Sequence, residues 1–236
     1  MVPLKNWDNK TWLSSQKYIK SFNRFILNQV KLNRNSRILD IGCGRGKILG
    51  SLYSKLKLKS KPTGIDIETH KDRDKRIKFI RIDALNYLKK DKKKFDLILI
   101  KQTIHFLKFK EIKKLISTCK TKLNHNGKIL IFTLETSKNE IPTFLLMKKK
   151  LKKSLNRDKK IINFISKLYP EIQKKRFFFK VKITKQKYIE MIKNRYISTL
   201  LSLSSGEISK GIDEINYKYK NNLIFKDKLV CLILNK

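Results

Sequence analysis

The stretch Ile38-Leu39-Asp40-Ile41-Gly42-Cys43-Gly44-Arg45-Gly46 decides the fold of this chain. It reads as a short buried strand that carries an acid near its end, followed by a turn with glycine at every second position. Residues 48–58 then show an amphipathic pattern that is typical of a helix. Glycines at such a junction lack the Cβ atoms that would keep a ligand from the backbone, and the next helix presents its N-terminus. The sequence therefore predicts a strand–turn–helix unit that can hold a ligand.

The spacing of these glycines discriminates between ligands. A dinucleotide fingerprint would need its third glycine at position 47, where this chain has Lys47. The three glycines instead resemble motif I of class I S-adenosylmethionine (SAM)-dependent methyltransferases. That resemblance implies that Asp40 lies near the methionine amino group of the cofactor. It also implies that the turn around the cofactor consists of Gly42, Cys43, Gly44 and Gly46.

Two further acids follow in the order that this family has. Gly64-Ile65-Asp66-Ile67 ends the second predicted strand, and an acid there can accept hydrogen bonds from both hydroxyls of a ribose. In the family this acid holds the ribose of SAM, so we assign Asp66, with Ile67 beside it, to the cofactor. Ile82-Asp83-Ala84 resembles the motif whose acid and following amide bind the adenine. The alternatives are that Asp66 only faces a loop and that Asp83 is a helix N-cap.

The resemblance extends over residues 36–135. Phe95-Asp96-Leu97-Ile98 resembles the fourth motif, after which Lys101 and Gln102 are expected at the mouth of the site and in contact with the cofactor. The segment from Leu123 to Leu130 resembles the element before the fifth strand. Only the ordered set of motifs is specific to the family.

The periodicity predicts an α/β fold. We expect strands at 37–41, 62–66, 77–82, 95–100 and 128–133, and helices at 14–30, with Ser14 or Ser15 as N-cap, and at 111–123, ended by Asn126-Gly127. Only ten residues separate Asp66 from Ile77, so the helix expected there is shortened or missing. This alternation, with the family resemblance, predicts a Rossmann-like, doubly wound sheet of seven strands, mostly parallel with an antiparallel last strand.

The pattern changes after Glu135. We expect two helices within 141–168, broken near Asn156-Arg157-Asp158, then a strand at 177–183, helices at 185–193 and 206–219, and a last strand at 227–234. We interpret 1–236 as a single methyltransferase domain. Its parts would be an N-terminal helical segment (1–30), a cofactor-binding core (36–135), a helical cap that includes strand six (136–226), and the last strand (227–236).

The methyl acceptor is less defined than the cofactor. Ile104-His105-Phe106-Leu107 resembles the segment after strand four in small-molecule methyltransferases, where a histidine or aromatic residue faces the acceptor. We therefore select His105 as the catalytic candidate, either orienting the acceptor or acting as a base; the alternative is a packing histidine. No proline pair follows strand four, and no cysteine is expected in the acceptor pocket. Both absences disfavour methyltransferases that act on nucleic-acid bases.

Two aromatic segments outside the core are also candidates. Trp12 could fold back over the cofactor, as N-terminal aromatic residues do in several small-molecule families, or could act as a hydrophobic staple for the first helix. Arg195 with Tyr196 could bind a carboxylate or phosphate of the acceptor, because arginine is rare in this chain. The alternative is a surface arginine.

Charge and cysteine content limit the partners. The net charge of +39 is spread evenly, and lysine outnumbers arginine 48 to 10, so nucleic acid is a possible but not a favoured partner. His70 and His125 are expected to be exposed. The three cysteines lack the spacing of a metal site, so no metal is expected. The polar N-terminus and the short apolar runs indicate a soluble cytoplasmic protein without a membrane partner.

These observations predict a SAM-dependent methyltransferase that moves a methyl group directly to a small-molecule acceptor, of which a carboxylic acid is one option. Two alternatives stay open. The acceptor could be RNA or a protein bound by the basic surface, or the chain could be a SAM-binding subunit without activity. The oligomeric state is left open.

Overall fold

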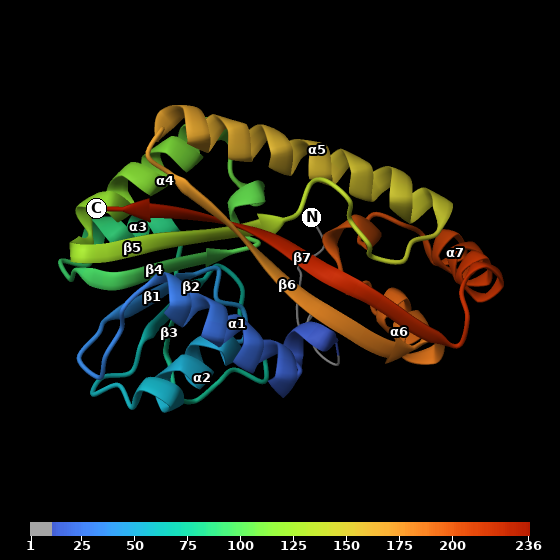
Figure 1. Cartoon of the computed structure of the whole chain (residues 1–236), viewed down its shortest axis with the longest axis horizontal. Coiled ribbons are helices and arrows are strands. Elements are labelled where there is room, and N and C mark those ends of the chain that lie inside the picture. The colour runs from blue at the N-terminus through green and yellow to red at the C-terminus, as the bar shows by residue number, and fades with distance from the viewer. Residues whose placement is uncertain (1–10) are drawn as a thin grey trace.

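A computed structural model describes residues 11–236 and shows one seven-stranded sheet with the strand order β3-β2-β1-β4-β5-β7-β6 (Figure 1). The first five strands are parallel, and β7 runs antiparallel to both β5 and β6. This confirms the predicted doubly wound sheet with its antiparallel last strand. The strands are β1 (Ile38–Ile41), β2 (Thr63–Asp66), β3 (Lys78–Arg81), β4 (Phe95–Lys101), β5 (Leu123–Leu134), β6 (Gln173–Thr184) and β7 (Asn222–Asn235).

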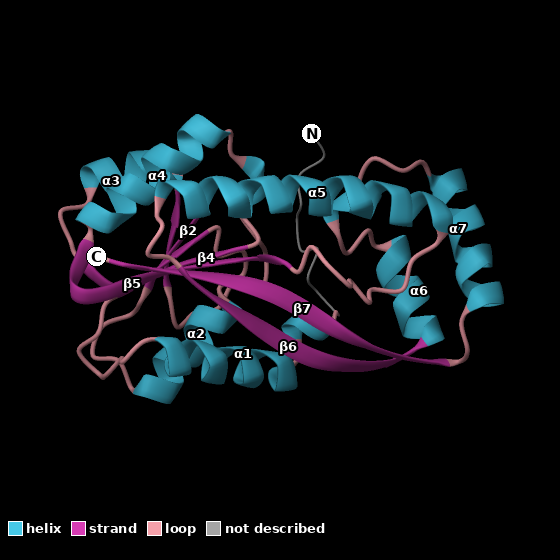
Figure 2. Cartoon of the chain, turned by 45° about the horizontal axis from the view of Figure 1, so that its top comes forward, coloured by secondary structure: helices cyan, strands magenta, loops and turns pink. Residues whose placement is uncertain are grey.

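Helices cover both faces of the sheet (Figure 2). On one face lie α1 (Gln16–Gln29) and α2 (Lys47–Leu56), and on the other lie α3 (Ala84–Lys90), α4 (Phe109–Thr121) and α5 (Leu145–Leu168). Beyond them, α6 (Lys185–Lys193) and α7 (Ser205–Lys218) lie near the far ends of β6 and β7. Three short 3₁₀ turns complete the elements: η1 (Trp12–Ser14), η2 (Ile104–Phe106) and η3 (Ser198–Leu200).

The continuous apolar run of β4 explains the layered arrangement. Leu97 and Leu99 pack into the core on the side of α1 and α2, whereas Ile98 and Ile100 pack into the core on the side of α3, α4 and α5. All four side chains are fully buried. A parallel strand with helices on both faces needs apolar residues on both faces, which is why this run lacks polar alternation.

The first helix follows its predicted pattern. Ser15 is the N-cap of α1, and its hydroxyl accepts a hydrogen bond from the amide of Tyr18 at 3.2 Å. One side of the helix buries Tyr18, Ile19, Phe22 and Ile26 against the sheet. The connection from β2 to β3 contains no helix among the described residues, as the ten-residue spacing indicated.

Two predicted boundaries were wrong. The helix break near Asn156-Arg157-Asp158 does not occur, because α5 runs unbroken through these residues and buries Leu151, Ile161 and Ile165. Asn126-Gly127 does not end a helix: α4 already ends at Thr121, and the pair lies inside β5. Pairing between β4 and β5 jumps from Phe95–Leu123 to Leu97–Lys128, so residues 124–127 form a bulge there.

Candidate functional site

The glycine turn is held against the neighbouring strand. The amides of Gly42 and Cys43 both donate to the carbonyl of Ile65 in β2, at 2.9 and 3.0 Å. The glycines at 42, 44 and 46 have φ values of 72°, 53° and 70°. This left-handed region is strained for residues with a side chain, which explains why glycine alternates through the turn.

Only one of the three glycines faces open space. A Cβ atom added at Gly42 would lie 2.1 Å from the hydroxyl of Thr103, and one at Gly46 would lie 2.2 Å from the side chain of Ile77. At Gly44 an added Cβ would meet no atom within 4 Å. Gly42 and Gly46 therefore allow the turn to pack against its neighbours, whereas Gly44 leaves backbone accessible to a ligand.

Asp66 at the end of β2 holds the backbone of Gly44 against the sheet by a hydrogen bond. Its Oδ2 accepts a hydrogen bond from the amide of Gly44 at 2.9 Å, and its Oδ1 accepts one from the amide of Glu68 at 3.0 Å. Each carboxylate oxygen can accept a further bond, so Asp66 can still bind two hydroxyls of a ligand. The next residue, Ile67, is 63% exposed and supplies apolar surface at the same edge.

Asp40 in β1 is a buried acid two residues before the glycine turn. It is only 4% exposed, and among the described residues its Oδ1 has no hydrogen-bond partner. Burial raises the pKa of its carboxyl to about 7, with Lys101 acting against the rise and Asp66 adding to it. A buried carboxylate with an unused oxygen is suited to a cationic ligand group, such as the ammonium of SAM.

Lys101 ends β4 and Gln102 follows it, and the charge of Lys101 acts on Asp40. The ammonium of Lys101 lies 5.7 Å from the ring centre of Tyr18 and 5.6 Å from that of Phe22. Gln102 has a φ of 52°, and its amide donates to the carbonyl of Phe132 in β5 at 2.8 Å. The chain thus turns sharply at the carboxyl edge of the sheet, and the contact of Lys101 and Gln102 with the cofactor stays a prediction.

Asp83 and Ala84 stand at the start of α3. The Oδ1 of Asp83 accepts from the amides of Leu85 and Asn86 at 2.9 and 3.1 Å, so Asp83 is a helix N-cap. This is the alternative role considered from the sequence. Assignment of Asp83 and Ala84 to the adenine stays a prediction.

His105 lies in η2, directly after β4, and is half-buried. Its ring contacts the ring of Phe106 at a centroid distance of 4.2 Å. Burial, aided by the positive charge of Arg157, lowers the pKa of the imidazole to about 4. A neutral imidazole with so low a pKa is a weak base, which favours an orienting role over proton abstraction.

Trp12 packs in the core. It is 6% exposed, its Nε1 donates to Oδ2 of Asp227 at 3.1 Å, and its ring lies edge-on to Tyr196 and Phe225. Arg195 is also engaged internally, because its Nη1 donates to the carbonyls of Leu200 and Leu203 at 2.8 and 2.6 Å. The contacts thus give both residues a structural role, and any contact with cofactor or acceptor stays a prediction.

Tyr196 is 2% exposed, and its hydroxyl lies 2.9 Å from that of Tyr188. Tyr196 thus packs in the core beside Trp12, and binding of the acceptor by Arg195 and Tyr196 stays a prediction. The expectation that His70 is exposed was wrong, since it is 7% exposed. His125 is exposed as expected.

The sequence reasoning missed Asp227. This residue of β7 is 2% exposed; burial raises the pKa of its carboxyl, against the effects of the bond from Trp12 and the charge of Lys101. The charge of Lys101 therefore acts to lower the pKa of two buried acids, Asp40 and Asp227. A lone acid on an otherwise apolar face of a predicted strand was the available signal.

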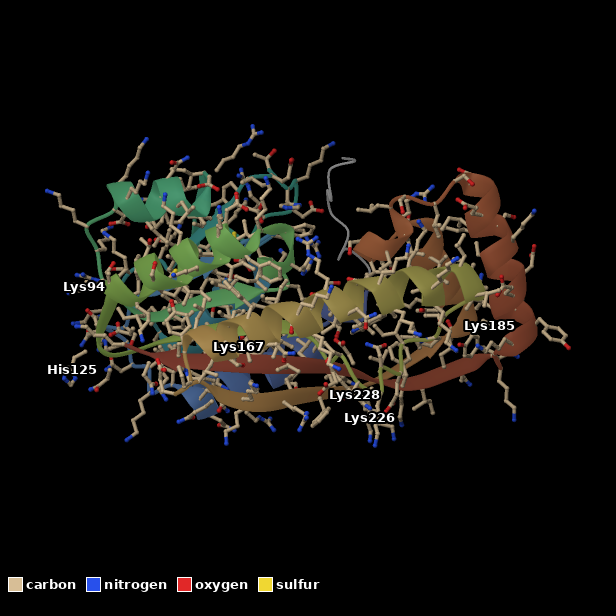
Figure 3. The ribbon with its side chains drawn as sticks, turned by 90° about the horizontal axis from the view of Figure 1, so that it is seen from above. Lys94, His125, Lys167, Lys185, Lys226 and Lys228 are labelled. Carbon is tan, nitrogen blue, oxygen red and sulfur yellow. The ribbon has the colours of Figure 1, made fainter. Side chains whose placement is uncertain are left out.

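Lysine side chains occur along the whole length of the molecule. The lysines labelled in Figure 3 come from loops, helices and strands along the length of the molecule. Among residues 11–236, no three histidine, cysteine, aspartate or glutamate side chains are grouped as a metal site would require. No helix in this range is long and apolar enough to cross a membrane.

Comparison with known proteins agrees with this geometry. A family model described as a methyltransferase domain matches residues 38–127, which contain β1, the glycine turn, Asp66 and His105. No curated protein matches the sequence.

Solved structures share the fold. A SAM-dependent methyltransferase from Archaeoglobus fulgidus is 22% identical, with a TM-score of 0.53 over 94% of this chain and 95% of its own. The plantazolicin methyltransferase BpumL, solved with SAH, is 17% identical, with a TM-score of 0.52 over 98% and 88%. A precorrin-8w decarboxylase from Methanobacterium thermoautotrophicum is 11% identical, with a TM-score of 0.51 over 91% and 89%. The chain thus shares the fold of class I SAM-dependent methyltransferases, and residues 38–127 match the model of a methyltransferase domain.

Proposed function

We propose that this protein is a SAM-dependent methyltransferase that acts on a small-molecule acceptor. The observation that carries the proposal is the open backbone at Gly44, which is bonded to Asp66 and follows the buried Asp40 by four residues. The matched methyltransferase domain and the shared fold support both the enzyme class and the cofactor.

The residues at this edge suit the separate parts of SAM. The unpartnered Oδ1 of Asp40 fits the methionine ammonium, and the free acceptor capacity of Asp66 fits the ribose hydroxyls. Ile67 would contact the adenine, whose edge Asp83 and the amide of Ala84 would bind. The remaining cofactor residues in this proposal are the glycine turn and the end of β4, namely Gly42, Cys43, Gly44, Gly46, Lys101 and Gln102.

The main task of the protein in this reaction is to position the acceptor. When bound, SAM supplies a methyl group that is already electrophilic because it is carried by a sulfonium. The chain must hold the acceptor in line with the methyl–sulfur bond and exclude water. His105, neutral at physiological pH, would orient the acceptor. We propose that the single domain encloses the acceptor beneath residues 136–226.

A calorimetric titration tests the proposal. The wild-type protein should bind SAM and S-adenosylhomocysteine with micromolar affinity. Asp66→Ala should weaken both by at least about tenfold, because it removes the ribose partner and the bond to Gly44. Asp213→Ala, at an exposed position of α7, is the matched control and should bind normally. Unchanged affinity in Asp66→Ala would refute the assignment.

A further inference from the structure

A basic hollow lies beside η2, between the start of α4 and the middle of α5. It has a volume of about 300 Å³ and is open to solvent. Four of its eight lining residues are cationic: Lys108, Lys153, Arg157 and Lys160. The whole chain has 58 basic residues among 236, so the fraction of lysine and arginine in the lining of the hollow is about twice that of the chain. Among the described residues, none of those that line it is acidic.

Arg157 connects this hollow to the predicted acceptor site. Its Nη2 donates to the carbonyl of Leu107 at 3.4 Å, two residues after His105. The positive charge of Arg157 also contributes to the lowered pKa of His105. The hollow and the imidazole are therefore close enough to share an electrostatic environment.

The nearby acids offset only part of this positive charge. The Oε2 of Glu111 accepts from the amide of Lys108 at 2.6 Å, so this carboxylate is engaged at the start of α4. Asp158 follows Arg157 on α5 and is only 3% exposed; burial raises the pKa of its carboxyl to about 6 against the opposing effect of the charge of Arg157, so this acid offsets part of one of the four cations. An anion in the hollow would meet the guanidinium and the three ammonium groups before either acid.

We propose that the hollow between residues 107–109 and α5 binds an oxyanion, a carboxylate or a phosphate, of the methyl acceptor and so places the acceptor beside His105. Arg157 can offer a planar pair of donors to such a group, and the lysines can adjust around it. Leu107 and Phe109 supply apolar surface for the adjoining part of the molecule. This inference rests on the proposed function and narrows its substrate to anionic molecules.

The test uses two simple oxyanions on the whole protein. Inorganic phosphate and, separately, succinate are titrated at pH 7 and constant ionic strength, and the Cε1–H signals of the histidines are followed by NMR. The signal of His105, assigned with His105→Gln, should shift and saturate with at least one of the two. The exposed His125 is an internal reference and should not shift in this way. Saturation by only one oxyanion identifies the preferred group.

Matched variants of α5 make the result specific. Arg157→Gln and Lys160→Gln should each weaken the binding by about tenfold. Lys167→Gln removes the same charge near the end of this helix, away from the hollow, and should leave the affinity within about twofold (Figure 3). A shift that never saturates, or equal affinities in Arg157→Gln and Lys167→Gln, would overturn the proposal.

Titration with S-adenosylhomocysteine separates this inference from the proposed function. If S-adenosylhomocysteine binds but neither oxyanion does, the cofactor assignment stands and the oxyanion site is refuted. If an oxyanion saturates His105 but S-adenosylhomocysteine does not bind, the hollow is an oxyanion site and the methyltransferase proposal fails.

Discussion

Replacing Asp40 with asparagine should make the protein more stable at alkaline pH. Burial raises the pKa of this carboxyl from 3.8 to about 7 in the folded chain. Between these values the folded state holds a proton that the unfolded state has lost, so stability falls as the pH rises from about 4 to about 7. A difference of about three pKa units corresponds to about 4 kcal/mol. This is the upper bound of the gain, since a buried amide also requires partners.

Urea unfolding between pH 4 and 8 measures this effect. The wild type should lose stability with rising pH, whereas Asp40→Asn should lack that part of the loss. The two proteins should therefore differ by about 2–4 kcal/mol at pH 8 and little at pH 4. Asp213→Asn, an exposed substitution on α7, controls for the loss of a negative charge.

The same variant should bind S-adenosylhomocysteine less tightly, because it lacks the charge proposed to hold the ammonium. Parallel pH profiles for the wild type and Asp40→Asn would refute the reasoning. They would show that the carboxyl is solvated in the folded protein, and the proposed ammonium site would lose its physical basis.

Two glycine substitutions test the packing of the site and of α7. Gly44→Ala should lower the free energy of unfolding in urea by about 1–2 kcal/mol, because the φ of Gly44 is 53°. It should also weaken S-adenosylhomocysteine binding at least about tenfold in calorimetry, because the new Cβ enters the open space. Gly211→Ala should destabilise by about 1–3 kcal/mol, since its Cβ would lie 2.6 Å from the ring of Phe144. Gly206→Ala on the same helix meets no atom within 4 Å and should not destabilise; equal losses of stability at 206 and 211 would contradict the predicted clash at Gly211.

The central fold was predictable because its signals are local. An apolar run without polar alternation, such as Leu97 to Ile100, indicates a strand covered on both faces, and the glycine turn after β1 indicates where ligands approach. The acids that end successive parallel strands meet at one edge, so Asp66 could be placed near the turn from chain order alone.

The two wrong boundaries show where local signals fail. Asn156 and Asp158 have low helix propensity, but α5 continues through them because its apolar residues pack along the sheet and η2. Asn126-Gly127 is a common turn pair, yet here it lies in a bulge of β5. In both places a contact between distant parts of the chain outweighs the preference of the local sequence.

The electrostatics of the site depend on contacts that no local pattern reveals. The low pKa of His105 depends in part on Arg157, which lies 52 positions later in the chain. Trp12 meets Asp227 across 215 positions. The sequence could nominate His105 and Trp12, but it could not tell whether their surroundings suit chemistry or packing.

The charges around Lys101 connect stability with the proposed function. This single ammonium influences two buried acids, Asp40 and Asp227, so it cannot fully neutralise both. Trp12 donates to Asp227, whereas the Oδ1 of Asp40 has no partner among the described residues. Asp40 is therefore the acid of this pair that keeps an oxygen without a hydrogen-bond partner. A ligand ammonium would pair with this oxygen, which explains why a destabilising acid is compatible with a binding site there.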